Sequence, residues 1–160
     1  MVRLLSYDSE MTLTRCFLRT TVLGLVVLCG FSEVYGAEKK VVSVPGRAPS
    51  PNYSAGLKVG DTLYVAGQTG NDPKTNAVPD EFEAEVKQCL ENVGAVLKAG
   101  GADFSDVVAV TVYLTDMEMF PRMNAVYTTV FKDPRPTRTT VGVVKLAGKA
   151  HIEITVVARK

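Results

Sequence analysis

Two charged residues near the C-terminus stand where neighbouring strands would hold their side chains in place. Glu153 lies in the stretch 151–158, where Ile152 and Ile154 alternate with it at a period of two. Its carboxylate therefore faces away from both isoleucines. Arg138 follows a Pro-Thr step and enters a valine-rich stretch, which predicts a fixed, partly buried guanidinium. A guanidinium is a planar fork that fits a carboxylate, and a shielded glutamate can orient or deprotonate a water molecule.

Spacing alone leaves simpler interpretations of both residues open. Glu153 also fits a solvated strand face or a salt bridge, and Arg138 also fits an ion pair with an aspartate. The single histidine, His151, lies at a strand start beside Lys149, which is typical of a surface residue. Cys89 falls on the apolar face of an expected helix, which favours a core thiol over a nucleophile.

Composition places the chain among ordinary globular proteins. It has 160 residues, of which 46% are apolar and 22% charged, and its formal net charge is +1. These values exclude a disordered chain and give no broad field for nucleic acid or anionic lipid. One histidine excludes paired-imidazole chemistry and an HExxH zinc site. The sequence has no Walker loop, GxGxxG, GxSxG or CxxC motif, so it predicts no metal and no organic cofactor.

The N-terminal stretch has the layout of an export signal. Residues 20–31 form an apolar run of twelve that follows Arg15 and Arg19 and precedes small residues. Such a run is too short to span a bilayer and fits a secretory signal peptide; an uncleaved anchor or a buried helix is the alternative. We expect residues 1–36 to be a signal peptide, with Met11 as an alternative start. The mature protein would be exported, periplasmic or secreted, without stable membrane association.

Removal of that signal changes the cysteine count. The remaining 124 residues keep the net charge of +1 and contain Cys89 alone. An internal disulfide is then excluded, so stability must come from the core and from oligomerisation. Residues 37–51 combine charge with closely spaced prolines, which predicts an extended arm. The domain proper is expected over 52–160.

Strand and helix patterns alternate along that domain. Asp80 with Glu83 resembles a capping box at the start of the first helix, and Gly100-Gly101 ends it. The expected elements are strands 53–59 and 62–66, a helix over 80–100, strand Val107–Leu114, a helix starting near Pro121, and strands 138–144 and 151–158. This order predicts an α+β domain with two helices on one face of a single sheet.

The second face of such a sheet has no helix to cover it. It needs water, another subunit or a ligand against it. Apolar residues fall on both faces of the expected strands, and this favours a homo-oligomer.

Five segments, taken together, carry a family resemblance. They are TLYVAGQTGNDPKT (62–75), QCLENVGAVLKAGG (88–101), DVVAVTVYLTDMEMFPRMNAVYTTVF (106–131), PTRTTVGV (136–143) and HIEITVVA (151–158). In this order, from about Tyr53 to the C-terminus, the chain resembles the RidA family, also called the YjgF or endoribonuclease L-PSP family.

The resemblance implies a chorismate-mutase-like α+β fold assembled as a homotrimer, with sites in the clefts between subunits. It implies hydrolytic deamination of 2-imino and enamine acids, such as 2-iminopropionate and 2-aminoacrylate, to 2-oxo acids and ammonia, without a cofactor. A small imino acid is the expected partner, and nucleic acid is not. An endoribonuclease of the L-PSP type is one alternative. A non-catalytic trimer that binds small carboxylates or a protein partner is another.

The resemblance also assigns residues to a site. The family's carboxylate-binding arginine falls on Arg138 and its water-positioning glutamate on Glu153. Thr140 is a departure, because many members carry a cysteine there, and Ala66 replaces a small hydroxyl residue. The substrate-binding positions fall on Tyr53, Gly67, Asn124 and Thr140.

Overall fold

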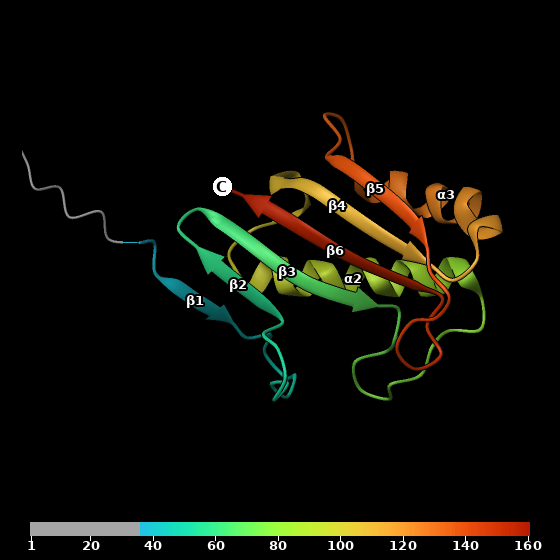
Figure 1. The fold of residues 1–160 in the computed structure, drawn as a ribbon, viewed down its shortest axis with the longest axis horizontal. Coiled ribbons are helices and arrows are strands. Elements are labelled where there is room, and N and C mark those ends of the chain that lie inside the picture. Colours follow the sequence, from blue (N-terminus) through green and yellow to red (C-terminus); the bar gives the residue numbers. More distant parts are fainter. Residues whose placement is uncertain (1–35) are drawn as a thin grey trace, which may run out of the picture. The chain divides into compact units, whose positions relative to one another are not determined.

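One six-stranded sheet organises the protein, whose computed structural model describes residues 36–160 (Figure 1). The order across the sheet is β1-β2-β3-β6-β4-β5. Neighbouring strands are antiparallel except β4 and β5, which are parallel. The strands are β1 (Lys39–Val42), β2 (Gly56–Val59), β3 (Thr62–Thr69), β4 (Val107–Leu114), β5 (Thr137–Gly142) and β6 (Ile152–Arg159).

Two helices pack on the same face of this sheet and lie behind it in Figure 1. They are α2 (Phe82–Ala99) and α3 (Phe120–Val130), and short 3-10 turns at Phe104–Asp106 and Met117–Met119 precede β4 and α3. The α+β class and the placement of both helices on one face are confirmed. Neither helix of residues 36–160 has the length and apolar character needed to cross a membrane.

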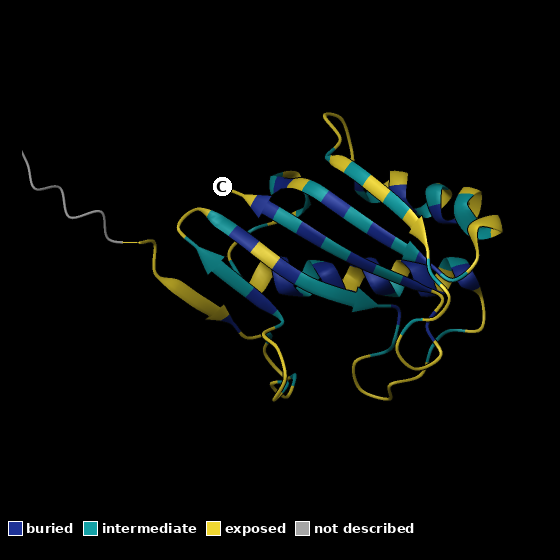
Figure 2. Ribbon diagram, viewed as in Figure 1, coloured by how far each residue is buried: buried dark blue, intermediate teal, exposed yellow. Residues whose placement is uncertain are grey.

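The core lies between the helices and the sheet. Alternate residues of β4 and β6 point into it, among them Val112, Ile152 and Ile154, each with 0% exposure. Figure 2 shows this alternation as buried and partly buried bands along β6. Val86 and Val93 of α2 close the core from the other side. Because the strand period is two, every second side chain of these strands is left for the opposite face.

The start of α2 differs from the expected capping box. Its N-cap is Glu81, and that side chain makes no capping hydrogen bond. Asp80 lies one residue too early to reach the first helical amides. Glu83 is turned outward instead, where both of its carboxylate oxygens accept hydrogen bonds from the guanidinium of Arg122 in α3.

The N-terminal part of the described chain adds a strand that the sequence patterns did not predict. Within 37–51, expected as an extended arm, β1 pairs with β2, with Lys39 opposite Val59 and Val42 opposite Gly56. The β2–β3 hairpin is confirmed, and Gly60 supplies the positive φ of +59° in its turn. The signal peptide expected at 1–36 lies, apart from Gly36, outside the described residues.

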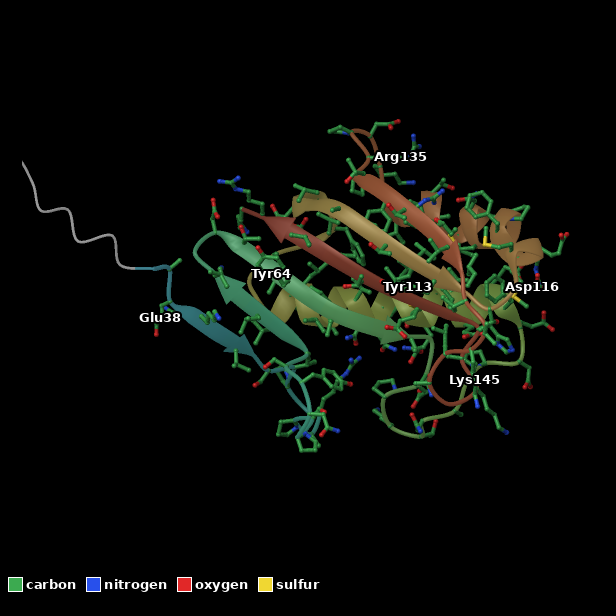
Figure 3. All side chains as sticks on the ribbon, in the orientation of Figure 1. Glu38, Tyr64, Tyr113, Asp116, Arg135 and Lys145 are labelled. Atoms are coloured by element: carbon green, nitrogen blue, oxygen red, sulfur yellow. The ribbon has the colours of Figure 1, made fainter. Side chains whose placement is uncertain are left out.

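The face of the sheet away from the helices is open and partly apolar. Val41 of β1, Tyr64 of β3 and Val141 of β5 are 65%, 50% and 38% exposed. Tyr64 and Tyr113 mark this face in Figure 3, where it is turned toward the viewer. No helix of residues 36–160 lies on this face (Figure 1). A further layer against this face would remove these apolar groups from water.

Candidate functional site

Arg138 is held on the helix-facing side of the sheet. In β5 it is paired with Val110 of β4, a buried residue beneath the helices. Its Nη1 donates a hydrogen bond of 2.8 Å to Oδ1 of Asn124 in α3. Its guanidinium lies over the ring of Tyr127, 4.5 Å from the ring centroid. The residue is partly buried, and the bond to Asn124 is the one hydrogen bond that its side chain makes within residues 36–160, so further N–H groups of the guanidinium are left for a ligand.

The chain path explains why Asn124 and Arg138 meet. Parallel β4 and β5 need a crossover connection, and α3 provides it. The helix therefore packs near the two strands that it connects, and its inner face contacts β5. Asn124 and Arg138 are among the residues that the sequence predicted for the site, and the fold brings them into direct contact.

Glu153 lies on the opposite, open side of the sheet. In β6 it is paired with Thr69 of β3 and with Tyr113 of β4. Together with Gly67, Leu146 and Thr155, Glu153 and Tyr113 line a shallow depression of about 370 Å³. The sequence prediction that Glu153 faces away from its two neighbouring isoleucines is confirmed, since both isoleucines are fully buried.

Gly67 makes room for the carboxylate of Glu153. The pairing of β3 with β6 is irregular between Val65 and Gln68, and Gly67 lies inside this irregularity. A Cβ added at Gly67 would overlap Oε1 of Glu153. A glycine inside a strand often marks such a close approach. Gly67 and Glu153, both predicted for the site, are thus brought together, as a second pair separate from Arg138 and Asn124.

The two pairs lie on opposite faces of one sheet. Arg138 is in register with Val110 and Glu153 with Tyr113. Val110 and Tyr113 are three residues apart in one regular stretch of β4, so their side chains point to opposite faces. The sheet itself separates the guanidinium from the carboxylate. A single chain therefore does not bring Arg138 and Glu153 into one site.

Tyr53 and Thr140, the other predicted residues, take different places. Tyr53 is 61% exposed and lines a separate cavity of about 240 Å³ with Arg47 and Gln68. Thr140 follows Arg138 on the same side of β5, where its hydroxyl is buried without a hydrogen-bond partner in the described chain. In one chain, Tyr53 is not part of either pair.

Two titratable residues predicted to have no role in the site behave differently from each other. Cys89 is fully buried, and burial raises the pKa of its thiol well above the ordinary value, so the core thiol is confirmed. His151 is half-exposed, as expected of a surface residue, but its Nδ1 lies 2.8 Å from Oε2 of the buried Glu85. Among residues 36–160, no three His, Cys, Asp or Glu side chains gather as metal ligands.

Comparison with known proteins assigns the chain to a family. The family model described as Endoribonuclease L-PSP matches residues 45–160. The chain belongs to this family, the RidA family. All six predicted site residues lie within the matched segment. The resemblance inferred from five sequence segments is thereby confirmed.

Individual RidA-family relatives agree with this assignment. A RutC family protein of Sulfurisphaera tokodaii is 44% identical over 117 residues, 71% of this chain and 94% of that protein. A protein of Dermatophagoides farinae named 2-iminobutanoate/2-iminopropanoate deaminase is 40% identical over 119 residues, 72% of this chain and 92% of its own length. The crystal structure of RidA from an Antarctic Psychrobacter has a TM-score of 0.70 at 33% identity, covering 75% and 98% of the two chains.

Two residues of this RidA-family chain lie next to the predicted pairs and were not predicted from the sequence. Tyr127 lies against Arg138, and Glu85 accepts hydrogen bonds from the backbone of His151 and Ile152, directly before Glu153. Glu85 could have been found, because it falls three residues after Phe82 on the apolar face of α2 and a charge there demands a partner. Tyr127 has no such signal, because an aromatic residue on a helix face is ordinary core.

Proposed function

We propose that the protein hydrolyses small 2-imino acids, such as 2-iminopropionate, to 2-oxo acids and ammonia. The observation that carries this proposal is the guanidinium of Arg138, which Asn124 holds from one edge at 2.8 Å and which keeps further N–H groups for a ligand. A guanidinium fixed in this way binds a carboxylate through two parallel hydrogen bonds. The relative named 2-iminobutanoate/2-iminopropanoate deaminase, 40% identical to this chain, supports the choice of substrate.

The site is completed between two copies of the chain, assembled as a homotrimer. One copy supplies Arg138 and Asn124, and the next supplies Glu153 and Gly67. Support comes from the opposite faces on which one chain holds its two charged residues and from the open face, where Tyr64 is 50% exposed. Association through the open face would bury that apolar surface.

The chemistry needs only these side chains and water. Arg138 binds the substrate carboxylate and fixes the plane of the imine. Glu153 takes a proton from a water molecule as the water oxygen bonds to the imine carbon, and it passes that proton to the imine nitrogen, which gives a tetrahedral intermediate with one hydroxyl and one amino group. As the C–N bond of this intermediate breaks, its hydroxyl proton passes through Glu153 to the departing nitrogen, which leaves the 2-oxo acid and ammonia and returns the glutamate to its starting state. Water and imino acid are consumed, and ammonia and 2-oxo acid are formed.

The direct experiment uses 2-iminopropionate generated by an amino-acid oxidase, with semicarbazide trapping of the imine that escapes hydrolysis. The wild-type protein should lower the amount of semicarbazide adduct, because it hydrolyses the imine before semicarbazide reacts with it. Arg138→Ala and Glu153→Gln should each abolish this decrease while the trimer persists on size-exclusion chromatography. Wild type that leaves trapping unchanged would contradict the proposal. If that protein still binds pyruvate, a non-catalytic carboxylate binder is favoured, and cleavage of RNA in a parallel assay would favour the ribonuclease.

Mixing the two inactive variants tests the shared site. When Arg138→Ala and Glu153→Gln are unfolded and refolded together in equal amounts, copies of both variants mix within trimers, and about a quarter of all sites in the sample combine an intact arginine with an intact glutamate. Activity should return to about that fraction of wild type. No return of activity on mixing would place both residues in one chain's site and contradict the shared arrangement.

We also propose that the chain is exported. The support is the apolar run 20–31 with its preceding arginines. Expression of the full chain in a cell with a secretory pathway, followed by mass determination of the purified protein, should give an N-terminus at Ala37. Protein that keeps Met1 or Met11 would contradict export with cleavage.

A further inference from the structure

The guanidinium of Arg138 touches three residues of α3. Its Nη1 donates a hydrogen bond to Asn124. Its Cζ lies 4.5 Å from the ring centroid of Tyr127 and 5.4 Å from the ring centroid of Phe120. These positions are separated by four and three residues, so they form one stripe along the helix. The helix therefore holds the guanidinium by two aromatic rings as well as by one hydrogen bond.

The ring of Tyr127 is itself rigidly packed. Tyr127 is 3% exposed, and its ring stacks on that of Phe131 with centroids 4.4 Å apart and planes 29° apart. Phe131 in turn meets Phe104 edge to face at 5.3 Å. Three aromatic rings thus form a continuous column that runs from the partly buried Phe104 through the buried Phe131 and Tyr127 to the guanidinium. Stacked and edge-to-face rings prefer defined geometries, so the last ring of the column is a firm support.

The hydroxyl of Tyr127 contributes little to this arrangement. Its oxygen is buried and has no hydrogen-bond partner within residues 36–160. Burial raises the pKa of Tyr127, and the nearby guanidinium groups of Arg138 and Arg135 oppose part of that rise. A substrate cannot reach an enclosed oxygen, and a buried hydroxyl without a partner destabilises the fold. What this position offers Arg138 is therefore the face of the ring.

We propose that Tyr127 is a positioning residue, whose ring supports the guanidinium of Arg138 while Asn124 holds one edge and leaves the other free for a substrate carboxylate. This inference rests on the proposed function, in which Arg138 binds that carboxylate. A cation over an aromatic face gains energy from the ring in addition to the hydrogen bond. Without the ring, the side chain would sample other rotamers, and each binding event would have to order it again.

Three variants test the inference. Tyr127→Leu removes the ring and should raise the KM for 2-iminopropionate and the Kd for pyruvate about five- to tenfold. Because the carboxylate is bound equally before and during the reaction, kcat should change less than KM. Tyr127→Phe keeps the ring and should restore KM and Kd to within about twofold of wild type. It should also unfold at the same or a higher denaturant concentration, since it removes the unpartnered hydroxyl.

Phe82→Leu is the matched control, because it removes a buried ring from α2 that lies outside the aromatic column. It should reduce stability about as much as Tyr127→Leu and leave KM and Kd within about twofold of wild type. Equal increases in KM for both leucine variants would indicate general loosening of the core and overturn the inference. An unchanged KM in Tyr127→Leu would also overturn it.

A readout that does not depend on turnover separates this inference from the proposed function. If wild type neither hydrolyses the imine nor binds pyruvate, the proposed function fails. The side-chain Nε–H signal of Arg138 in ¹⁵N NMR spectra then decides the inference. It should be a single sharp resonance in wild type and Tyr127→Phe, and broadened in Tyr127→Leu. A sharp, unshifted resonance in Tyr127→Leu would show that the ring does not position the guanidinium.

Discussion

Arg138 and Glu153 lie on opposite faces of the same sheet, and each face holds its charged residue by different means. Arg138 is held by side chains of one helix, through Asn124 and Tyr127. Glu153 is placed by backbone features, namely the missing Cβ of Gly67 and the register of three strands. Arg138 should therefore respond gradually to substitutions around it, whereas Glu153 should respond sharply to changes in the backbone beside it.

The largest effect should come from the anchor of β6 next to Glu153. Glu85 is fully buried, and its Oε1 accepts hydrogen bonds of 2.6 Å and 3.3 Å from the backbone N–H groups of His151 and Ile152. Glu85→Leu leaves these donors without an acceptor and should lower the free energy of unfolding by about 3 kcal/mol. Urea unfolding at pH 7 measures this loss.

Glu85→Gln is the control for that experiment, because the amide oxygen can still accept both hydrogen bonds. It should lose less than half as much stability as Glu85→Leu. If Glu85→Leu is as stable as wild type, the backbone at the start of β6 is held by other contacts. The two faces of the sheet then differ less in how they hold Arg138 and Glu153.

The next largest effect concerns Gly67. In Gly67→Ala the added methyl group overlaps the carboxylate of Glu153, which is the end of a flexible side chain and can move aside. Displacement of a catalytic group by about 1 Å lowers rates about a hundredfold, so kcat for 2-iminopropionate should fall by about that factor. The melting temperature should change by no more than about 2 °C.

Gly142→Ala, at the end of β5, is the matched glycine control. Its added Cβ would lie 3.1 Å from the side chain of Met117 and near neither charged residue. Its kcat should stay within about twofold of wild type. Full activity of Gly67→Ala would mean that Glu153 tolerates displacement and that its face is no more sensitive than the other.

A smaller effect is expected on the arginine face. Asn124→Ala removes the 2.8 Å hydrogen bond to Nη1 of Arg138, while Tyr127 continues to support the guanidinium. Loss of one such bond should raise KM for 2-iminopropionate about fivefold. Steady-state kinetics measure it, with kcat expected to change less than KM. A hundredfold loss would show that this face is as sensitive as the other.

The smallest effect should come from the ion pair that joins α3 to α2. The guanidinium of Arg122 holds the pKa of Glu83 at about 2, below its ordinary 4.5. Because the folded-state pKa is the lower one, the pair stabilises the fold above about pH 4.5 and loses that effect as the pH falls toward 2. Glu83→Gln should lower the melting temperature at pH 7 by about 2 °C.

That difference between Glu83→Gln and wild type should shrink as the pH falls below 4.5 and disappear in thermal unfolding at about pH 1, below the folded-state pKa of Glu83. A difference that persists there would assign the effect to packing rather than to charge. Unchanged KM in Glu83→Gln would further indicate that core contacts, and not this exposed pair, keep α3 over Arg138.

The sequence could predict the elements whose own residues determine them. Val107–Leu114 is a run of β-branched and apolar residues, and its predicted bounds match β4. The edge strand β1 could not be predicted in this way. Its four residues include Lys39 and Lys40, and it is a strand only because β2 pairs with it. The N-cap of α2 is Glu81 and not the predicted Asp80, because a capping pattern in the sequence does not specify which residue starts the helix.

For the site as well, features set by neighbouring residues could be predicted, and features set by contacts between distant segments could not. The outward direction of Glu153 follows from alternation within one strand, so the sequence was sufficient. The contact of Arg138 with Asn124 depends on α3 lying over β5, which is a property of the parallel β4–β5 crossover. Short-range patterns do not contain that information, and the family resemblance supplied it. The assignment of opposite faces needs the register of β4 with both of its neighbours.

The outer strand β1 has a consequence for how the protein behaves at high concentration. It ends the sheet on one side, and a free strand edge invites another chain to extend the ladder. Lys39 and Lys40 lie on that edge and are exposed, and Pro45, which lacks an amide hydrogen, follows shortly after it. Charged side chains and proline oppose fibril-like growth. This border should therefore oppose fibril-like association of the proposed trimers at high concentration.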